Sequence, residues 1–411
     1  MGIGQMDIVK DIQVINNGKI TAPEGYYAGG LHCGIKRKRP DLAWLYSEVP
    51  ADAAAVYTTN VFQAAPLKVT KESIKTDRKI QAVIVNSGNA NACTGEEGYK
   101  NALRMRAAFA DHLNINEDLV AVSSTGVIGE QLPMDKILHG IDQISPDERN
   151  PDLFEKAILT TDTTQKSAGV QLEIDGKPVT IAGAAKGSGM IEPNMATMLA
   201  FITTDAKVGG EALQTALKTV TDKTFNMITV DGDTSTNDMV LLMANGLAGN
   251  NELSAGHPEW HKFLNGLEIV CQKLAKDIAR DGEGATKLIS VHVRGAASNR
   301  DAKKIAKAIV GSNLVKTAVF GKDPNWGRII CAIGYSGIET APAGLNLTIG
   351  PWQVLSNGSP VNFDENAASQ YFEENSEVEI FADLNSGNGK AMAWGCDLTY
   401  EYVKINSLYR T

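Results

Sequence analysis

The threonine at position 197 is the residue whose surroundings most favour covalent chemistry. It follows the segment KGSGMIEPNMA (186–196), in which two glycines and a proline prescribe one backbone path into an apolar run. A threonine hydroxyl needs a neighbouring base, and the α-amine of an N-terminal threonine, with a reference pKa of about 7.7–8.0, can serve as one. Because Thr197 is internal, this chemistry requires cleavage of the Ala196–Thr197 bond. The same pattern also fits a glycine-rich turn that leads into a buried strand.

Motifs for other common chemistries are missing from the sequence. There is no G-x-S-x-G elbow, no phosphate-binding P-loop and no strand–G-x-G-x-x-G–helix fingerprint. The loop 231–233 starts like a calcium loop, but Thr236 and Leu242 replace the required glycine and glutamate, so we expect a turn with Asx-type capping. His257 and His261 stand four residues apart without a third ligand, and we expect them to be solvated or to cap a turn. No metal site is predicted.

Composition and charge narrow the class of protein. The 39 basic and 48 acidic residues give a net charge of −9, which argues against nucleic acid or an anionic membrane as the main partner. Five scattered cysteines without a C-x-x-C pair predict free, buried thiols in a reducing compartment. The start MGIGQMDIVKDIQ resembles no targeting segment, and no apolar run reaches 18 residues. We therefore expect a soluble, cytoplasmic protein.

Strand-like and helix-like segments alternate through both halves of the chain, which predicts an α/β or α+β fold built in layers. No Pro/Ser-rich linker separates two domains. Asp175-Gly176 lies between two alternating segments, 170–174 and 179–182, and predicts a hairpin. The other expected strands are 42–46, 53–57, 81–85, 121–124, 198–203, 227–230 and 288–293. The expected helices are 99–112, 134–144, 152–159, 211–224, 259–280, 301–310 and one from Asn237. Residues 320–328 are expected to form a loop, and short strands are expected to dominate after Gly344.

Several long motifs in one order carry a family resemblance. The segment KGSGMIEPNMATML (186–199) resembles the self-processing signature of the ornithine acetyltransferase family, which includes the bifunctional glutamate N-acetyltransferases of arginine biosynthesis. The resemblance runs from about Gly30 to the last residue. The other family-like motifs are VNSGNANACTG (85–95), STGVIG (124–129), TTDT (160–163), VDGDTSTND (230–238), DGEGATK (281–287), GKDPNWGR (321–328) and YVKINSLYRT (402–411).

The resemblance implies a self-cleaving transferase. Thr197 would attack the Ala196 carbonyl and divide the precursor into an α chain (1–196) and a β chain (197–411) that interleave in one folded body. The freed Thr197 would accept the acetyl group of N-acetylornithine, release ornithine and pass the acetyl group to glutamate in a ping-pong reaction. The family's oxyanion donors fall on Thr125 and Gly126, a hydroxyl and a backbone N–H.

The family's substrate-contacting positions also map onto this chain. They are Thr160, Lys186, Thr197, Glu283, Asn406 and Thr411. Lys186 would either bind a carboxylate or lower the pKa of the Thr197 amine, and Glu283 suits the ornithine ammonium. The register leaves Thr160 and Thr161 as alternatives, of which we prefer Thr160. The last two positions would require a docked C-terminal tail, because chain ends are normally frayed.

The fold, assembly and co-substrates also follow from the resemblance. It implies a layered α/β sandwich like that of the N-terminal-nucleophile-like aminopeptidases, and a heterotetramer of two α and two β chains. No cofactor is required, although acetyl-CoA is a second acetyl donor in bifunctional members, and the sequence leaves open which type this is. The alternative is an aminopeptidase or amidohydrolase on the same scaffold, which would pass the acyl group to water. A binding protein that stays uncut is a further alternative. TTDT, DGEGATK and INSLYRT favour an amino-acid acceptor.

Overall fold

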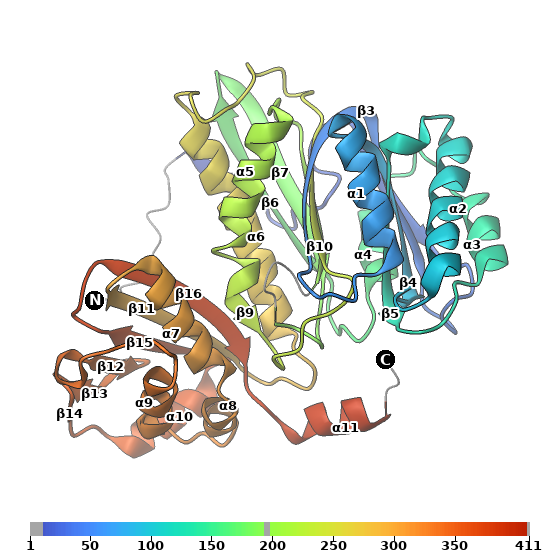
Figure 1. The fold of residues 1–411 in the computed structure, drawn as a ribbon. Helices are drawn as coiled ribbons and strands as arrows, with labels where there is room; N and C mark the ends of the chain where they lie inside the picture. Colours follow the sequence, from blue (N-terminus) through green and yellow to red (C-terminus); the bar gives the residue numbers. More distant parts are fainter. Residues whose placement is uncertain (1–10, 193–197, 409–411) are drawn as a thin grey trace.

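The strands of the protein form two sheets (Figure 1). The computed structural model describes residues 11–192 and 198–408, and within these residues the sheets have nine and seven strands. The larger sheet has the order β1 (Ile12–Val14), β6 (Lys166–Ile174), β7 (Lys177–Lys186), β8 (Leu199–Thr204), β10 (Met239–Ala244), β3 (Leu42–Tyr57), β4 (Lys79–Asn89), β5 (Val120–Val127), with β2 (Tyr26–Leu31) also paired to β3. The smaller sheet has the order β14 (Ser359–Pro360), β13 (Trp352–Ser356), β12 (Asn346–Ile349), β15 (Glu377–Asp383), β11 (Leu288–Ala296), β16 (Gly389–Cys396), β9 (Ile228–Thr229).

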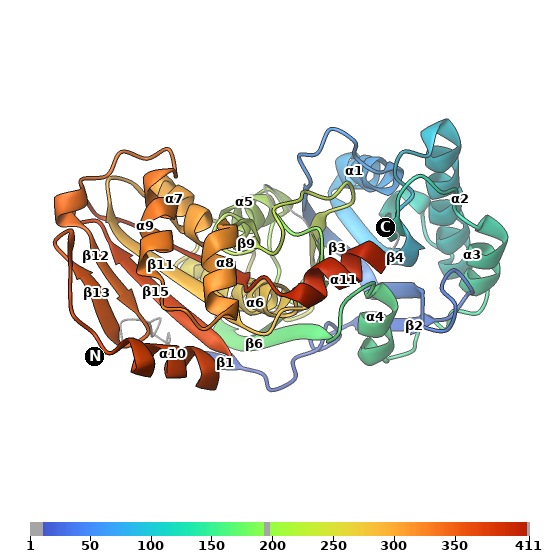
Figure 2. The ribbon, with the colours of Figure 1, turned by 90° about the horizontal axis from the view of Figure 1, so that it is seen from below.

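Helices cover the sheets to give a layered α/β sandwich, as the sequence predicts (Figures 1 and 2). Their bounds are α1 (Ala65–Asp77), α2 (Gly95–Leu113), α3 (Met134–Ile141), α4 (Pro151–Ile158), α5 (Gly210–Thr221), α6 (Trp260–Arg280), α7 (Asn299–Gly311), α8 (Asn313–Phe320), α9 (Trp326–Gly334), α10 (Glu365–Glu374) and α11 (Tyr400–Leu408). Short 3₁₀ turns lie at Glu117–Leu119, Phe225–Met227 and Pro342–Gly344. In the described part of the chain, no helix is long and apolar enough to cross a membrane.

The middle strands of the larger sheet are buried on both faces. Every residue of β8 and β10 is buried. Along β8, Leu199 and Phe201 join one hydrophobic core with Phe154 of α4, whereas Ala200 and Ile202 join a second core with helices α5 and α6. Two covered faces explain why these strands are apolar throughout rather than alternating. They form a rigid base for the loops that leave their ends.

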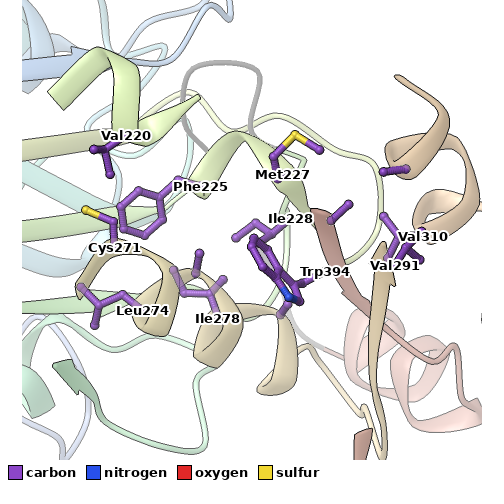
Figure 3. Close-up of a cluster of buried hydrophobic side chains, with 14 of the residues drawn as sticks. Val220, Phe225, Met227, Ile228, Cys271, Leu274, Ile278, Val291, Val310 and Trp394 are labelled. Carbon is purple, nitrogen blue, oxygen red and sulfur yellow. The ribbon is translucent and has the colours of Figure 1, made fainter. Parts of the chain in front are cut away.

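Helix α6 connects the two sheets through a shared core (Figure 3). Its buried residues recur every three to four positions, as in an amphipathic helix. Figure 3 shows Cys271, Leu274 and Ile278 of α6 in this core with Phe225 and with Trp394 of the smaller sheet. Trp394 is almost fully buried. Because α6 ends at Arg280, this core also fixes the position of the loop that starts at Asp281.

Residues on the two sides of position 196 alternate in the larger sheet. Strand β7 pairs antiparallel with β8, with Lys186 opposite Leu199. Strand β10 pairs antiparallel with β3, with Met239 opposite Tyr57. The described segments 11–192 and 198–408 therefore each supply only part of this sheet.

Most of the expected elements are found, with corrections at particular positions. The hairpin is confirmed, since Asp175 and Gly176 have φ of 52° and 69° and join β6 to β7. The helix expected from Asn237 is wrong: this segment forms β10, and a fully buried strand lacks the alternation that marks a strand. The loop expected at 320–328 is shorter, because α8 extends to Phe320 and α9 begins at Trp326. Helices α10 and α11 also interrupt the strands expected after Gly344.

The cysteine prediction is correct in one respect and wrong in another. All five cysteines are free, and all lie in the described residues. Cys271 and Cys396 are buried as expected, but Cys93 and Cys331 are exposed.

Candidate active site

Four charged side chains from distant segments form a buried ion cluster, which we define as Asp162, Lys166, Lys186 and Asp281. Lys166 Nζ lies 2.8 Å from Asp162 Oδ1 and 2.6 Å from Asp281 Oδ2. Lys186 Nζ lies 4.0 Å from Asp162 Oδ2. The side chains of Asp162 and Lys166 have no exposed surface. Charges this deeply buried are tolerated because each carboxylate has a cationic partner.

The partners in the ion cluster control its protonation. Burial alone would raise the pKa of Asp162, but the charges of Lys166 and Lys186 and the hydrogen bonds from Lys166 and the Gly187 N–H hold this pKa well below its usual value. Burial would likewise lower the pKa of Lys166, but Asp162 and Asp281 outweigh that effect and raise it. Asp162 and Lys166 therefore remain ionised across the neutral pH range.

The ion cluster orders the backbone around it. Asp162 accepts hydrogen bonds from the backbone N–H of Thr160 (3.1 Å) and of Gly187 (2.7 Å). Asp281 accepts from the N–H of Thr163 at 3.1 Å and from the hydroxyl of that threonine. Two predicted substrate positions, Thr160 and Lys186, are thereby held at one carboxylate, where the Thr160 N–H and Lys186 Nζ both approach Oδ2.

Glu283 is brought to the same place by the loop that follows α6. The hydroxyl of Ser188 donates to the Asp281 carbonyl (2.7 Å), and the Glu283 N–H donates to the Ser188 carbonyl (3.0 Å). Gly189 lies against the Glu283 carboxylate, where a Cβ would come within 2.3 Å of Cδ. A side chain at position 189 would displace the Glu283 carboxylate, which explains the second glycine in KGSGM (186–190).

The C-terminal helix contributes Asn406. Its Nδ2 donates to Glu283 Oε2 at 2.7 Å. No residue of α11 is buried, and the helix extends from the region of α8 outside the main layers (Figures 1 and 2). The Tyr402 hydroxyl donates to Asp231 Oδ2 (3.3 Å), and the Tyr400 ring contacts Phe320. The tail is therefore docked through a few polar and aromatic contacts rather than through a hydrophobic face.

The Thr125–Gly126 pair lies at the end of β5. Gly126 has φ of 135° and faces Gly88 of β4, whose carbonyl carbon would be 2.3 Å from an added Cβ, so only glycine fits. The Thr125 side chain is 9% exposed, and no described residue hydrogen-bonds its hydroxyl. A hydroxyl without a partner among the described residues, beside a backbone N–H on a strand end, suits an oxyanion that develops during acyl transfer.

Asn237 connects this strand end to the strand that follows position 197. Its amide Nδ2 donates to the carbonyls of Ser124 (2.8 Å) and Ala90 (2.5 Å). Two residues later, the Met239 N–H donates to the Met198 carbonyl (3.0 Å). One short segment therefore links the oxyanion candidates to the first described residue after position 197.

The acidic loop at 231–233 holds the described segment that leads toward position 193. Asp231 accepts hydrogen bonds from the N–H groups of Met190 (2.7 Å) and Ile191 (2.8 Å). It also accepts from the Asp233 N–H at 3.3 Å, which confirms the expected Asx-type turn. The Thr234 hydroxyl donates to the Glu192 carbonyl (3.0 Å). This loop therefore fixes the backbone that leads to residue 193.

The predicted site residues have different outcomes. Ala196, Thr197 and Thr411 lie outside the described residues. The structure brings Thr160 and Lys186 to Asp162, and Asn406 to Glu283 on the loop that follows Asp281. Thr125 and Gly126 follow Ser124 at the end of β5, which Asn237 links to the start of β10. Thr161 is adjacent to Thr160 and partly exposed.

Sequence reasoning missed the residues that hold the site together. The family-like motifs include Asp162, Asp281 and Asn237. The motifs therefore marked these positions but did not indicate what the side chains do. Lys166 lies outside these motifs. His257 caps the approach to α6, where its Nδ1 accepts from the Glu259 N–H (3.1 Å). Within the described residues, no group of three or more His, Cys, Asp or Glu could hold a metal ion.

A strand end with a hydroxyl and a glycine N–H, and a buried ion cluster that leads into the loop of Glu283, fit an enzyme that transfers an acyl group between amino acids. The chain belongs to the ArgJ family, whose model matches residues 27–411. It is 59% identical to the arginine biosynthesis bifunctional protein ArgJ of Oceanobacillus iheyensis, over 98% of this chain and 99% of that protein. It is 58% identical to the Listeria monocytogenes protein of the same name, over 96% and 99%. The predicted class, an acetyltransferase of amino-acid biosynthesis, is confirmed.

A solved structure agrees with this assignment. The crystal structure of ArgJ from Bacillus halodurans is similar to this chain at 56% sequence identity, with a TM-score of 0.51. The match covers 52% of this chain and the whole of that chain.

Proposed function

We propose that this protein is a glutamate N-acetyltransferase that moves the acetyl group of N-acetylornithine to glutamate through an ester on Thr197. The observation that carries this proposal is that four predicted substrate residues from distant segments meet in two pairs, one at Asp162 of the ion cluster and one on the loop that follows Asp281. Family membership supports it, because close relatives are named for arginine biosynthesis. The four residues are Thr160, Lys186, Glu283 and Asn406.

The reaction divides into two balanced half-reactions. The Thr197 hydroxyl attacks the acetyl carbonyl of N-acetylornithine, and its proton passes to the α-amine of the same residue. The C–N bond then breaks, and the departing ornithine amine takes up that proton. In the second half-reaction the amine of glutamate attacks the ester and gives a proton to the α-amine of Thr197. The C–O bond then breaks, and the threonine oxygen takes up that proton to restore the hydroxyl. The hydroxyl of Thr125 and the N–H of Gly126 donate to the oxyanion in both, and each is worth about 3–4 kcal/mol.

The ion cluster suits both amino acids. Both carry an α-carboxylate, which a lysine such as Lys186 can bind. Glu283 offers a carboxylate to the ornithine ammonium, and Asn406 orients it through the 2.7 Å hydrogen bond. We infer that no cofactor takes part and, since the relatives are named bifunctional, that acetyl-CoA serves as a second acetyl donor.

We also infer that the chain cuts itself between Ala196 and Thr197 and assembles as two α and two β chains in the cytoplasm. Interleaving of the two segments in the larger sheet supports this, since β7 and β8 would hold the products together after cleavage. The Bacillus halodurans structure supports it too, because its chain matches 52% of this one, the share that residues 197–411 occupy. The free cysteines fit a reducing compartment.

Intact mass under denaturing conditions tests the nucleophile. We expect two species that divide the 43.9 kDa chain after residue 196, and one uncut, inactive species for Thr197→Ala. A single active species of full mass in the wild type would contradict the mechanism. Gel filtration with light scattering then tests the two-plus-two assembly.

Ornithine release tests the acceptor. We expect ornithine to form steadily from N-acetylornithine only when glutamate is present, with one N-acetylglutamate per ornithine. Steady release without glutamate would identify an amidohydrolase instead. N-acetylglutamate formation from acetyl-CoA and glutamate tests the second activity.

A further inference from the structure

Lys36 lies between strand β4 and the segment that carries Thr160, and the proposed reaction gives it no role. Its Nζ donates to the carbonyl of Leu159 at 2.5 Å, directly before Thr160, and to that of Pro40 at 3.1 Å. On the other side, its Cγ lies 3.1 Å from where a Cβ on Gly88 would be. Gly88 is the residue that faces Gly126 across β4 and β5. Lys36 therefore spans the two parts of the site.

The backbone around Lys36 is fixed by a fully buried carboxylate. Asp41 accepts hydrogen bonds from the N–H of Cys33 (2.6 Å), Gly34 (3.2 Å) and Lys36 itself (2.8 Å). These bonds use the Asp41 oxygens on the backbone, and neither oxygen forms an ion pair with Lys36 Nζ. The loop thus presents the lysine side chain from a rigid support.

The charge of Lys36 is incompletely compensated. Among the described residues, no carboxylate lies within 4.0 Å of its Nζ, and its hydrogen-bond partners are neutral carbonyls. Burial lowers its pKa to about 8; Asp41 and Asp162 act against this effect, while Lys186 and Arg39 add to it. A partly buried ammonium beside a second lysine is stabilised by an incoming anion.

We propose that Lys36, together with Lys186, binds the α-carboxylate that N-acetylornithine and glutamate share, and so holds each substrate between Thr160 and the oxyanion donors. In both substrates the α-carboxylate is two bonds from the reacting nitrogen, whereas the side-chain charge is several bonds further away. A group that contacts both Leu159 and the strand facing Gly126 is in the right place for the near charge. Glu283 and Asn406 face the distant charge. This inference rests on the proposed function and extends it.

Lys36→Met tests the proposal, with Lys36→Arg as the charge-conserving variant and Lys38→Met as the control from the exposed part of the same loop. We expect Lys36→Met to raise KM for N-acetylornithine and for glutamate in parallel, by about 10- to 100-fold, as for the loss of one charge-assisted hydrogen bond. The value of kcat should change much less. Lys36→Arg should recover most of the loss, and Lys38→Met should match the wild type.

Competition by ornithine and by ornithinamide separates the carboxylate from the rest of the molecule. The inhibition constant of ornithine should rise in Lys36→Met, whereas that of ornithinamide, in which a neutral amide replaces the carboxylate, should stay constant. Unchanged KM values, a rise for glutamate alone, or an equal loss for both inhibitors would overturn the assignment. Ornithine binding by calorimetry gives the same comparison without turnover. If the wild type binds ornithine but releases none from N-acetylornithine, the proposed function fails separately.

Discussion

The two parts of the candidate site differ in charge: the strand end at Thr125 and Gly126 is neutral, and the ion cluster is fully charged. The part proposed to hold the oxyanion consists of neutral dipoles on strand ends: a hydroxyl, a backbone N–H and glycines in close contact. The part proposed to bind the substrates consists of full charges, with the side chains of Asp162 and Lys166 buried completely. Neutral donors can stabilise a charge that exists only in the transition state, because they need no compensation in the resting enzyme. Buried charges need permanent partners, so they suit substrates that arrive already charged.

Removing the central cation of the charged part should have the largest effect. Lys166→Met would leave Asp162 and Asp281 buried without their shared partner, which costs about 3–5 kcal/mol of folding stability. Urea unfolding with loss of tertiary signal measures this. The control is Lys273→Met, which breaks an exposed i,i+4 pair with Asp277 and should cost less than about 0.5 kcal/mol. Equal midpoints for both variants would show that the ion cluster does not support the fold.

Distorting the neutral part should affect turnover most. Gly126→Ala would place a Cβ 2.3 Å from the carbonyl carbon of Gly88 and force β4 and β5 apart. The Thr125 hydroxyl and the N–H of residue 126 would then no longer point at the proposed oxyanion. We expect kcat to fall by about 10²- to 10³-fold, as for the loss of an oxyanion donor. Steady-state kinetics on folded protein measure it.

Gly129→Ala is the matched control for this prediction. Gly129 also has a positive φ, 85°, but nothing lies within 4 Å of an added Cβ. Gly129→Ala should therefore lower the free energy of unfolding by about 1 kcal/mol and leave kcat near the wild-type value. If both alanine variants lost turnover equally, strain rather than donor position would be the cause.

The charged part should distinguish the two substrates where the neutral part does not. Glu283→Gln keeps the hydrogen-bonding shape beside Asn406 but removes the charge that suits the ornithine ammonium. We expect KM for N-acetylornithine to rise by about 10-fold, with little change for glutamate. Parallel changes for both substrates would argue against this role for Glu283.

The smallest effect should appear in the pH dependence of stability. The pKa of Asp162 is held below its unfolded value, so its contribution is complete above pH of about 4 and is lost as the pH falls through the folded pKa. The pKa of Lys166 is raised above its unfolded value, so its contribution is complete below pH of about 10 and is lost as the pH rises through the folded pKa. Urea midpoints should therefore be flat near neutrality. A maximum of the urea midpoint confined to acid or to alkaline pH would contradict this prediction.

The sequence motifs predicted several residues of the candidate site, but they did not predict the buried ion pairs that fix the positions of these residues. Thr160, Lys186, Glu283 and Asn406 could be predicted because they lie in recognisable segments. The roles of Asp162 and Lys166 could not, because a buried ion pair depends on which segments the fold brings together. Lys36 lies in the basic run KRKR, which by pattern alone is typical of a solvated loop. Strand β10 was mistaken for a helix because its burial on both faces erases the period of two.

The alternation of strands in the larger sheet also bears on how the protein must be made. Lys186 of β7 pairs with Leu199 of β8, and β10 pairs antiparallel with the edge of β3. A fragment that ended between these strands would leave long apolar edges open to other molecules. Synthesis as one polypeptide supplies both segments in equal number, at the same place and at very high effective concentration. Under the cleavage that we propose, the continuity of the chain before the cut would therefore be what assembles the two products.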